Sequence, residues 1–303
     1  MIDVLQIQSS LKWIHISNPS EEDFDYLIEH YKFHPLDIED CRSKRQRPKI
    51  DVYDDYYFII LHFPYFDKLN RFLITKEVKI FWGANYIITV GKSHWVVRQL
   101  FNQAKEDEDL QKELLSGTSD NLLYLILEKL LSENFSIISR VGNEVELLNK
   151  ELFNKKAEKT IERISITRKN IILLNTIIKP QLRLFHKFES GDIKGFAEDM
   201  EEYWGNILDS YQKTWDMIED YAELIEGLSK TFDSLQTNKI NEIMKVLTFF
   251  SSVMLPLTFI TGFYGMNIVL PMQNNPNAFW LIVAILASIT GGLIFIFKKR
   301  NWM

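Results

Sequence analysis

The feature that most constrains this chain is a stretch of 52 residues, Val246–Phe297, that contains no Asp, Glu, Lys or Arg. It divides into two apolar spans, 246–263 and 278–297, joined by a polar but uncharged loop. A helix needs about 20 apolar residues to cross the ~30 Å hydrocarbon core of a bilayer. The rest of the chain mixes charged and apolar residues as water-soluble domains do. The pattern predicts a large soluble domain attached to a C-terminal membrane hairpin.

The charges that flank the two spans predict how they are oriented. Lys298, Lys299 and Arg300 follow the second span, Lys239 and Lys245 precede the first, and the loop between them has no basic residue. Because Lys and Arg accumulate on the cytoplasmic side, we expect a multi-pass protein of the cell membrane with both termini in the cytoplasm. Two buried core helices are the alternative, but such helices rarely run together without charge and end in a basic cluster.

Composition excludes several classes of partner and process. The net charge of −6 and the absence of a basic stripe argue against a nucleic-acid partner. Cys41 is the sole cysteine, so no intrachain disulfide can form, which suits a reducing cytosol. The first residues lack the basic and apolar regions of a signal peptide. We therefore expect the C-terminal spans themselves to direct insertion into the lipid bilayer.

Residues 1–92 have the pattern of a cytoplasmic α/β domain with a mixed sheet. Runs rich in β-branched and aromatic residues predict strands at 11–16, 56–63, 78–82 and 86–90. Asn18 as N-cap, Pro19 in the first turn and Glu21 at the third position predict a helix to about Tyr31. A second, short helix is expected to open at His34. Strands joined by short turns favour an antiparallel or mixed sheet with helices packed on it.

Residues 93–195 are expected to form long antiparallel helices. One helix runs from a cap at Ser119 or Asp120 to about Phe153, and the next covers 157–188 with a kink at Pro180. The glycines of 191–195 then interrupt the pattern.

From 196 the sequence predicts one continuous stalk helix, 196–264, that becomes the first membrane span. Its apolar residues recur at a mean spacing near 3.5, as in a coiled coil. They are Ile207, Tyr211, Trp215, Ile218, Ala222, Ile225, Leu228, Phe232 and Leu235. A helix this long must bury that seam on the two preceding helices, on other copies of itself, or on both.

Motifs for catalysis are missing from the sequence, so we do not expect an enzyme. It has no glycine-rich phosphate loop, no H-E-x-x-H and no Cys/His cluster. The scattered histidines are expected to be structural or surface groups, and the acidic run 106–109 a solvated loop or helix end.

One face of the helix that enters the membrane carries the most informative pattern. Reading back from Asn267 at helical spacing gives small polar and apolar side chains without charge: Thr258, Leu255, Ser251, Leu247, Met244 and Asn241. Around a symmetry axis this face would line a pore with polar rings and hydrophobic constrictions. The spacing is equally compatible with a face that packs on the second span. The residues 265–267 could likewise be a simple turn.

The sequence Tyr264-Gly265-Met266-Asn267 resembles the motif that identifies the CorA-type divalent-cation transporters. Residues 241–248 and 255–262 are similar to the pore helix of that family, and 297–302 to its basic tail. In the soluble part, His34-Pro35-Leu36 with Glu39-Asp40, and 46–49, resemble further family landmarks.

This resemblance implies an α+β fold: a cytoplasmic α/β domain, a long-helix funnel and two C-terminal transmembrane helices in a homopentamer. Gly265, Met266 and Asn267, in an external loop of residues 264–277, would form the outer mouth, where amide oxygens meet the waters of a hydrated cation. Thr258 and Asn241 would form inner polar rings. Met244, Leu247 and Leu255 would form the hydrophobic gate, and 298–303 the basic cytoplasmic tail.

Two departures from the family pattern are visible. The loop residues 268–277 contain no acidic side chain, which the best-known branch carries there. One position of the intracellular cation sensor of the family falls on Asn206 in place of an aspartate. Asp209, one turn later, is retained, and Asp67 on the sheet domain is its candidate partner.

The favoured function is channel-like uptake of hydrated Mg²⁺, and of Co²⁺ or Ni²⁺, driven by the membrane potential. A divalent cation that enters down ~100 mV gains about 4.6 kcal/mol, so no ATP site is needed. We expect no cofactor beyond a transported or regulatory divalent cation. The departures leave open a Zn²⁺ transporter of the same architecture, with or without proton coupling. A membrane-anchored coiled-coil scaffold without a pore is the third alternative.

Overall fold

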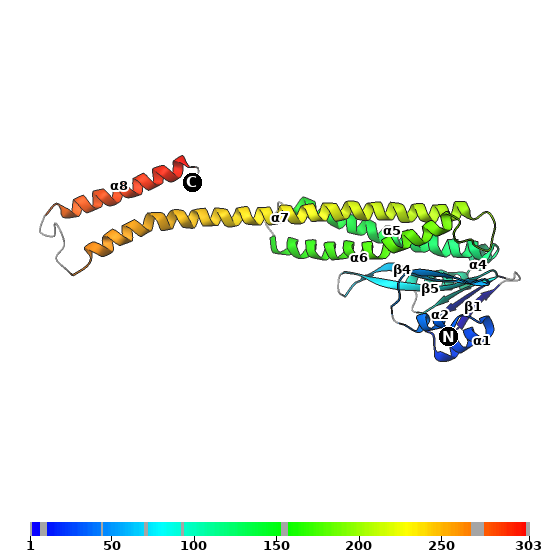
Figure 1. Ribbon diagram of the computed structural model, residues 1–303. Coiled ribbons are helices and arrows are strands. Elements are labelled where there is room, and N and C mark those ends of the chain that lie inside the picture. The colour runs from blue at the N-terminus through cyan, green and yellow to red at the C-terminus, as the bar shows by residue number, and fades with distance from the viewer. Residues whose placement is uncertain are drawn as a thin grey trace. The chain divides into compact units, whose positions relative to one another are not determined.

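The computed structural model of the chain describes residues 2–6, 11–43, 45–69, 72–91, 94–152, 157–267 and 276–300. It divides into two compact units, Met1–Ser229 and Lys230–Met303, which are treated separately below. The helices and strands of both units are drawn in Figure 1.

The expected mixed sheet forms the centre of the first unit, and it has six strands where sequence analysis predicted four. Its strands are β1 (Ile2–Gln6), β2 (Lys12–Ile16), β3 (Lys49–Val52), β4 (Tyr56–Asp67), β5 (Phe72–Gly83) and β6 (Tyr86–Val90). Their spatial order is β1-β2-β6-β5-β4-β3, and β2 with β6 is the parallel pair among antiparallel neighbours. Sequence analysis missed β1 and β3 because these edge strands are short and partly polar. It also ended β4 too early, since the β4–β5 hairpin extends to Asp67 paired with Phe72.

Helices α1 (Glu21–Tyr31) and α2 (Pro35–Arg42) cover one face of the sheet (Figure 1). Phe24 and Leu27 of α1 pack in one core with Phe58 and Phe81 of the sheet. The expected N-cap of α1, Asn18, is wrong. Ser20 caps the helix instead, because its hydroxyl accepts from the Asp23 N–H at 3.3 Å while the Asp23 carboxylate accepts from the Ser20 N–H at 3.0 Å.

Helices α3 (Trp95–Glu106), α4 (Glu108–Leu115), α5 (Ser119–Glu151) and α6 (Ala157–Glu189) belong to the same unit. Thr118 caps α5 in place of Ser119 or Asp120. Those two residues are buried and bind elsewhere: the Ser119 hydroxyl accepts from the indole N–H of Trp82 at 3.1 Å. The acidic run is the junction of α3 and α4, where Asp107 ends one helix and caps the next. Helix α6 continues through Pro180.

Helix α7 (Glu201–Tyr264) begins five residues later than expected. The Asp120 carboxylate accepts from the Phe196 N–H at 2.9 Å, and Asp199 has a positive φ of 66°, so 196–199 form bends before the helix. Within the first unit, its seam is buried on the preceding helices. Tyr211 stacks on Phe185 of α6 with ring centroids 4.8 Å apart. Farther along, Leu235 is 37 % exposed, so burial of the seam ends before that residue.

The side chain of Gln181 completes the edge of β4 where β3 ends. Its amide oxygen accepts from the His62 N–H at 2.8 Å, and its amide nitrogen donates to the His62 carbonyl at 2.8 Å. Gln181 is fully buried. The buried backbone groups of β4 are thereby satisfied by a helix side chain in place of a strand.

Candidate functional site: the exposed face of the membrane helix

The second unit contains two helices that are long and apolar enough to cross a membrane. They are the C-terminal part of α7 and α8 (Ala278–Lys299). Basic residues 298–300 follow the apolar part of α8. Both expected spans therefore lie on helices, and α8 begins at the expected residue.

One side of α7 in this unit faces α8. The rings of Phe249 and Phe297 meet edge to face, with centroids 5.4 Å apart. Val253, Pro256 and Ile260 follow Phe249 at helical spacing, and all are partly covered. Phe249 thus marks the side of α7 that contacts α8, and the three other residues lie along the same side.

The predicted pore face lies on the other side of α7 and is exposed. Met244, Leu247 and Leu255 are 52 %, 57 % and 70 % exposed, and Asn241 and Thr258 are exposed as well. At about 3.6 residues per turn, Met244, Leu247 and Thr258 lie roughly opposite Phe249, whereas Leu255 and Asn241 lie on the flanks of that face. The single chain thus presents an uncharged, mixed polar and apolar helix face without a partner among the described residues.

The Gly-Met-Asn motif lies immediately after the last residue of α7. The Gly265 N–H donates to the Thr261 carbonyl at 2.9 Å, and the Met266 N–H to the Phe263 carbonyl at 3.3 Å. A Cβ at position 265 would come within 3.1 Å of the Thr261 carbonyl oxygen, a tight contact that glycine avoids. Asn267 is exposed. Most of the expected external loop, 268–275, and the tail residues 301–303 lie outside the described residues.

The three residues of the candidate sensor all lie in the first unit, two of them on α7 and one at the end of β4. Asn206 and Asp209 are exposed on α7, and the Asn206 amide donates to the Tyr124 hydroxyl at 3.1 Å. Asp67 ends β4, where its carboxylate accepts from the Leu69 N–H at 2.9 Å. In the part of the chain that the structure describes, no group of three or more His, Cys, Asp or Glu has the geometry to hold a metal ion.

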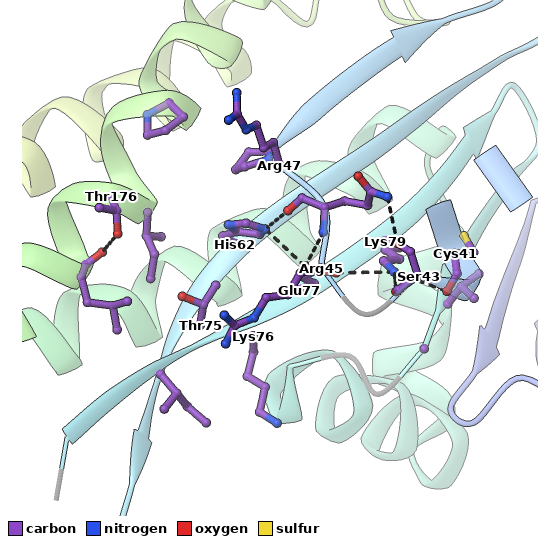
Figure 2. A pocket seen from close by; sticks show the side chains of 18 of the residues that line it. Cys41, Ser43, Arg45, Arg47, His62, Thr75, Lys76, Glu77, Lys79 and Thr176 are labelled. Atoms are coloured by element: carbon purple, nitrogen blue, oxygen red, sulfur yellow. Dashed lines mark hydrogen bonds and ion pairs between the residues drawn. The ribbon is translucent and has the colours of Figure 1, made fainter. Parts of the chain in front are cut away.

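Sequence analysis missed a basic cavity in the first unit (Figure 2). Arg45, Arg47, Lys76 and Arg183 are among the residues that line it. These residues come from segments up to 138 positions apart, counting from 45 to 183, so no local motif could have indicated the cavity.

A mixed-sheet soluble domain, followed by a helix that runs on into the first of two membrane-spanning segments, defines a class of two-span membrane proteins. Residues 8–299 match the family described as CorA-like Mg²⁺ transporter protein, and the chain belongs to this family. It is accordingly a protein of the cell membrane.

Individual relatives agree with this assignment. The chain is 25 % identical over 302 residues to a cobalt/magnesium transport protein CorA of Thermotoga maritima, covering 97 % of this chain and 84 % of the relative. It is 23 % identical over 186 residues to a zinc transport protein of Pectobacterium atrosepticum, covering 61 % of this chain and 57 % of the relative. The solved CorA magnesium transporter of Methanocaldococcus jannaschii shares its fold, with a TM-score of 0.82 at 22 % identity over 98 % of this chain and 93 % of that chain.

Proposed function

We propose that this protein conducts hydrated divalent cations, chiefly Mg²⁺, into the cell through a pore lined by the exposed face of α7. The observation that carries the proposal is that face: it is uncharged and exposed, it ends at the Gly-Met-Asn motif, and it is turned away from Phe249, which contacts α8. Mg²⁺ loses its water shell reluctantly. Neutral amide and hydroxyl oxygens bind that shell without stripping it.

A pore of this kind requires several copies of the chain, and we propose a homopentamer. One α7 face cannot enclose a water-filled path. Exposed Met244, Leu247 and Leu255 would meet their copies around an axis and close the path there as a hydrophobic constriction. In this assembly Asn267 forms the outer ring, Thr258 and Asn241 form inner polar rings, and the three apolar residues form a gate. The membrane potential drives entry, and both termini lie in the cytoplasm.

The soluble unit would regulate the pore through a second cation site. Asp209 and Asn206 of one copy would share an intracellular cation with Asp67 on the sheet domain of an adjacent copy. A single chain lacks the second half of such a site. Binding there would favour the closed arrangement of the stalk helices.

Replacement of Asn267 by Ala tests the selectivity ring. In proteoliposomes with an inward-negative potential, we expect Mg²⁺ uptake to fall at least tenfold, because the amide oxygens that bind the hydrated cation are lost. Asn277→Ala, at the start of α8, is the matched control and should retain uptake. Size-exclusion chromatography should give the same oligomer for both variants. Normal uptake by the assembled Asn267→Ala protein would refute the proposed ring.

A Zn²⁺ transporter is the second candidate, favoured by the similarity to the zinc transport protein and by the uncharged sequence 268–277. Uptake of Mg²⁺ and Zn²⁺ should be measured side by side, with and without a pH gradient. Mg²⁺ entry driven by voltage alone supports the first proposal. Zn²⁺ entry that needs the pH gradient, without Mg²⁺ entry, supports the second. An assembled protein that conducts neither ion would instead be a scaffold.

A further inference from the structure

The first unit contains a cavity of about 1440 Å³ that is lined by none of the proposed pore residues. Three segments supply most of its lining: residues 41–43 and 45–48 near the end of α2 and before β3, residues 72–77 and 79 of β5, and one face of α6 (Figure 2). Pockets for small ligands commonly enclose about 300–1,000 Å³. The cavity therefore has room for a ligand of the size of a nucleotide or larger.

The charged residues that line the cavity are almost all basic. Eight Lys and Arg residues line it, but a single acidic residue, Glu77, does so. The whole chain has the opposite balance, with 35 basic and 41 acidic residues. A concave surface lined by one sign of charge concentrates the electric field and attracts ligands of the other sign. The cavity thus favours anions in a protein that is otherwise acidic.

Glu77 is already bound by other groups and does not neutralise the free cations. Its carboxylate accepts from the Gln46 N–H at 2.9 Å and lies 3.4 Å from the Lys79 ammonium. Burial acts to raise its pKa, but the hydrogen bonds from His62 and Gln46, with the charge of Lys79, outweigh burial and hold the pKa below its ordinary value. Lys79 in turn is held by the Asp40 and Ser43 carbonyls at 2.8 and 3.0 Å. The charges of Glu77 and Lys79 thus neutralise each other in the wall of the cavity.

Most of the other cations lack an acidic partner. Among the residues that the structure describes, no ion pair is recorded for Arg45, Arg47 or Arg183, and all three are exposed. Lys76 and Lys169 lie over aromatic rings, which leaves their charge unneutralised. Arg42 differs, since it pairs with Glu21 at 2.6 Å.

The cations are spread along the cavity. On α6 the lining residues recur three or four positions apart from Lys169 through Thr176 and Arg183 to Lys187, so they share one face of the helix. Lys169 and Lys187 are separated by about 27 Å along the axis, at about 1.5 Å per residue. Because the cations are this far apart, a single phosphate group can contact only those that lie close together. An anion with several linked phosphates can contact cations from more than one wall of the cavity.

We propose that this cavity binds a soluble anion with several linked phosphate groups, such as a nucleoside triphosphate or inorganic polyphosphate. Arg45 and Arg47 bind it from the segment before β3, and Arg183 and Lys187 bind it from α6. Arginine suits this role because its planar fork donates two parallel hydrogen bonds to a phosphate group.

Calorimetry on the full-length protein in detergent tests the proposal, with EDTA present so that no divalent cation contributes. We expect ATP and tripolyphosphate to bind saturably, with about one site per chain, and orthophosphate to bind at least tenfold more weakly. Vesicles that contain a phosphoinositide form a separate arm, since a lipid headgroup offers the same chemistry. Binding to these vesicles without binding to either soluble anion would overturn the proposal in favour of a membrane ligand. Binding to none of these probes would also overturn it.

Substitutions on two walls locate the site. Arg47→Gln and Arg183→Gln should each weaken tripolyphosphate binding about tenfold, because each removes charge-assisted hydrogen bonds. Arg168→Gln is the matched control: Arg168 is also exposed on α6 but does not line the cavity, so binding should change less than twofold. Unchanged melting temperatures will show that all three variants fold. Equal weakening by Arg168→Gln would mean that only the general charge of the surface matters, and the proposed site would be wrong.

Discussion

Gly195 lies where the chain passes from α6 to α7, directly against the side chain of Asp120. A Cβ at this position would come within 2.1 Å of an Asp120 carboxylate oxygen and 3.2 Å of the Trp82 ring. The same carboxylate holds the Phe196 N–H, and Asp120 is fully buried. The absence of a side chain at 195 thus allows Asp120 to fix the segment from which α7 starts.

Substitution of Gly195 by Ala should destabilise the protein by about 1–3 kcal/mol, because the added methyl group displaces Asp120 from its hydrogen bonds. Thermal unfolding of the detergent-solubilised protein measures the loss. Lys194→Ala, at the exposed neighbouring position, should change stability by less than about 0.5 kcal/mol. A Gly195→Ala protein as stable as the Lys194→Ala protein would show that Asp120 can move without cost.

At the scale of single residues, local chemistry could be predicted from the sequence, but distant hydrogen-bond partners could not. The helix face 241–258 could be identified because its residues follow one another at a fixed spacing. The role of Asp120 could not, since its partner Phe196 is 76 positions away. The cap of α1 was misplaced by two residues because Asn18 and Ser20 are both good N-caps and only the Asp23 side chain favours Ser20.

At the scale of elements, the start of α3 depends on the protonation state of His94. Its Nδ1 accepts from the Val96 N–H at 3.5 Å, and its Nε2 lies 3.2 Å from the Pro64 carbonyl. These contacts require a neutral ring with the proton on Nε2. Burial, helped by the charge of Lys76, lowers the pKa of His94 to about 4, although the hydrogen bond to Pro64 opposes this shift. The cap is therefore formed by the neutral ring.

His94 should make the protein less stable in acid. Its pKa of about 4 in the folded state lies below the 6.5 of the unfolded chain, so the unfolded chain binds more protons between these values. Stability is then lost as the pH falls through this window, by about 2 kcal/mol between pH 7 and pH 5 for this group. His94→Asn keeps an N-cap acceptor without a titrating ring. Its melting temperature should fall less than that of the unaltered protein over the same pH range.

Other buried groups modify this pH dependence without removing the comparison. His15 is also lowered to about 4 by burial, so it adds a loss of the same sign. Burial raises the pKa of Asp37 and Asp120, whose contributions therefore become more favourable as the pH falls. His15, Asp37 and Asp120 all remain in the His94→Asn protein. If its melting temperature changed with pH as that of the unaltered protein does, the role assigned to His94 would be wrong.

At the scale of the whole molecule, the proposed regulatory cation site lies between the soluble unit of one copy and that of the adjacent copy. Asp209→Ala should weaken the cation site that closes the stalk, so Mg²⁺ uptake at high internal Mg²⁺ should rise several-fold. Asp216→Ala, two turns later on α7, is the control, because Asp216 binds Gln212 on its own helix. If high internal Mg²⁺ inhibited uptake by Asp209→Ala as strongly as it inhibits uptake by Asp216→Ala, the sensor would lie elsewhere.

The architecture of the chain could be predicted from its sequence because the strongest signals are local: uncharged spans, an apolar seam with a period near 3.5, and alternating strands. The candidate pore face could be proposed because its residues also follow one another at a fixed local spacing. Sequence reasoning could not predict the basic cavity, because Arg47 and Arg183 come to line the same cavity only after the sheet and α6 pack together. Nor could it place β3, whose four residues become a strand only because β4 offers a free edge.

The amide of Gln181 also decides how long β3 can be. In the register of β3 with β4, Lys49 pairs with Ile60, so Arg47 would pair with His62 if the strand continued. Gln181 already occupies both backbone groups of His62. Residues 45–48 are thereby kept out of the sheet, and their arginines remain on the cavity wall. The amide of Gln181 on α6 thus replaces a peptide group and fixes the end of a strand. A substitution at position 181 would alter both the length of β3 and the position of the arginines in the cavity.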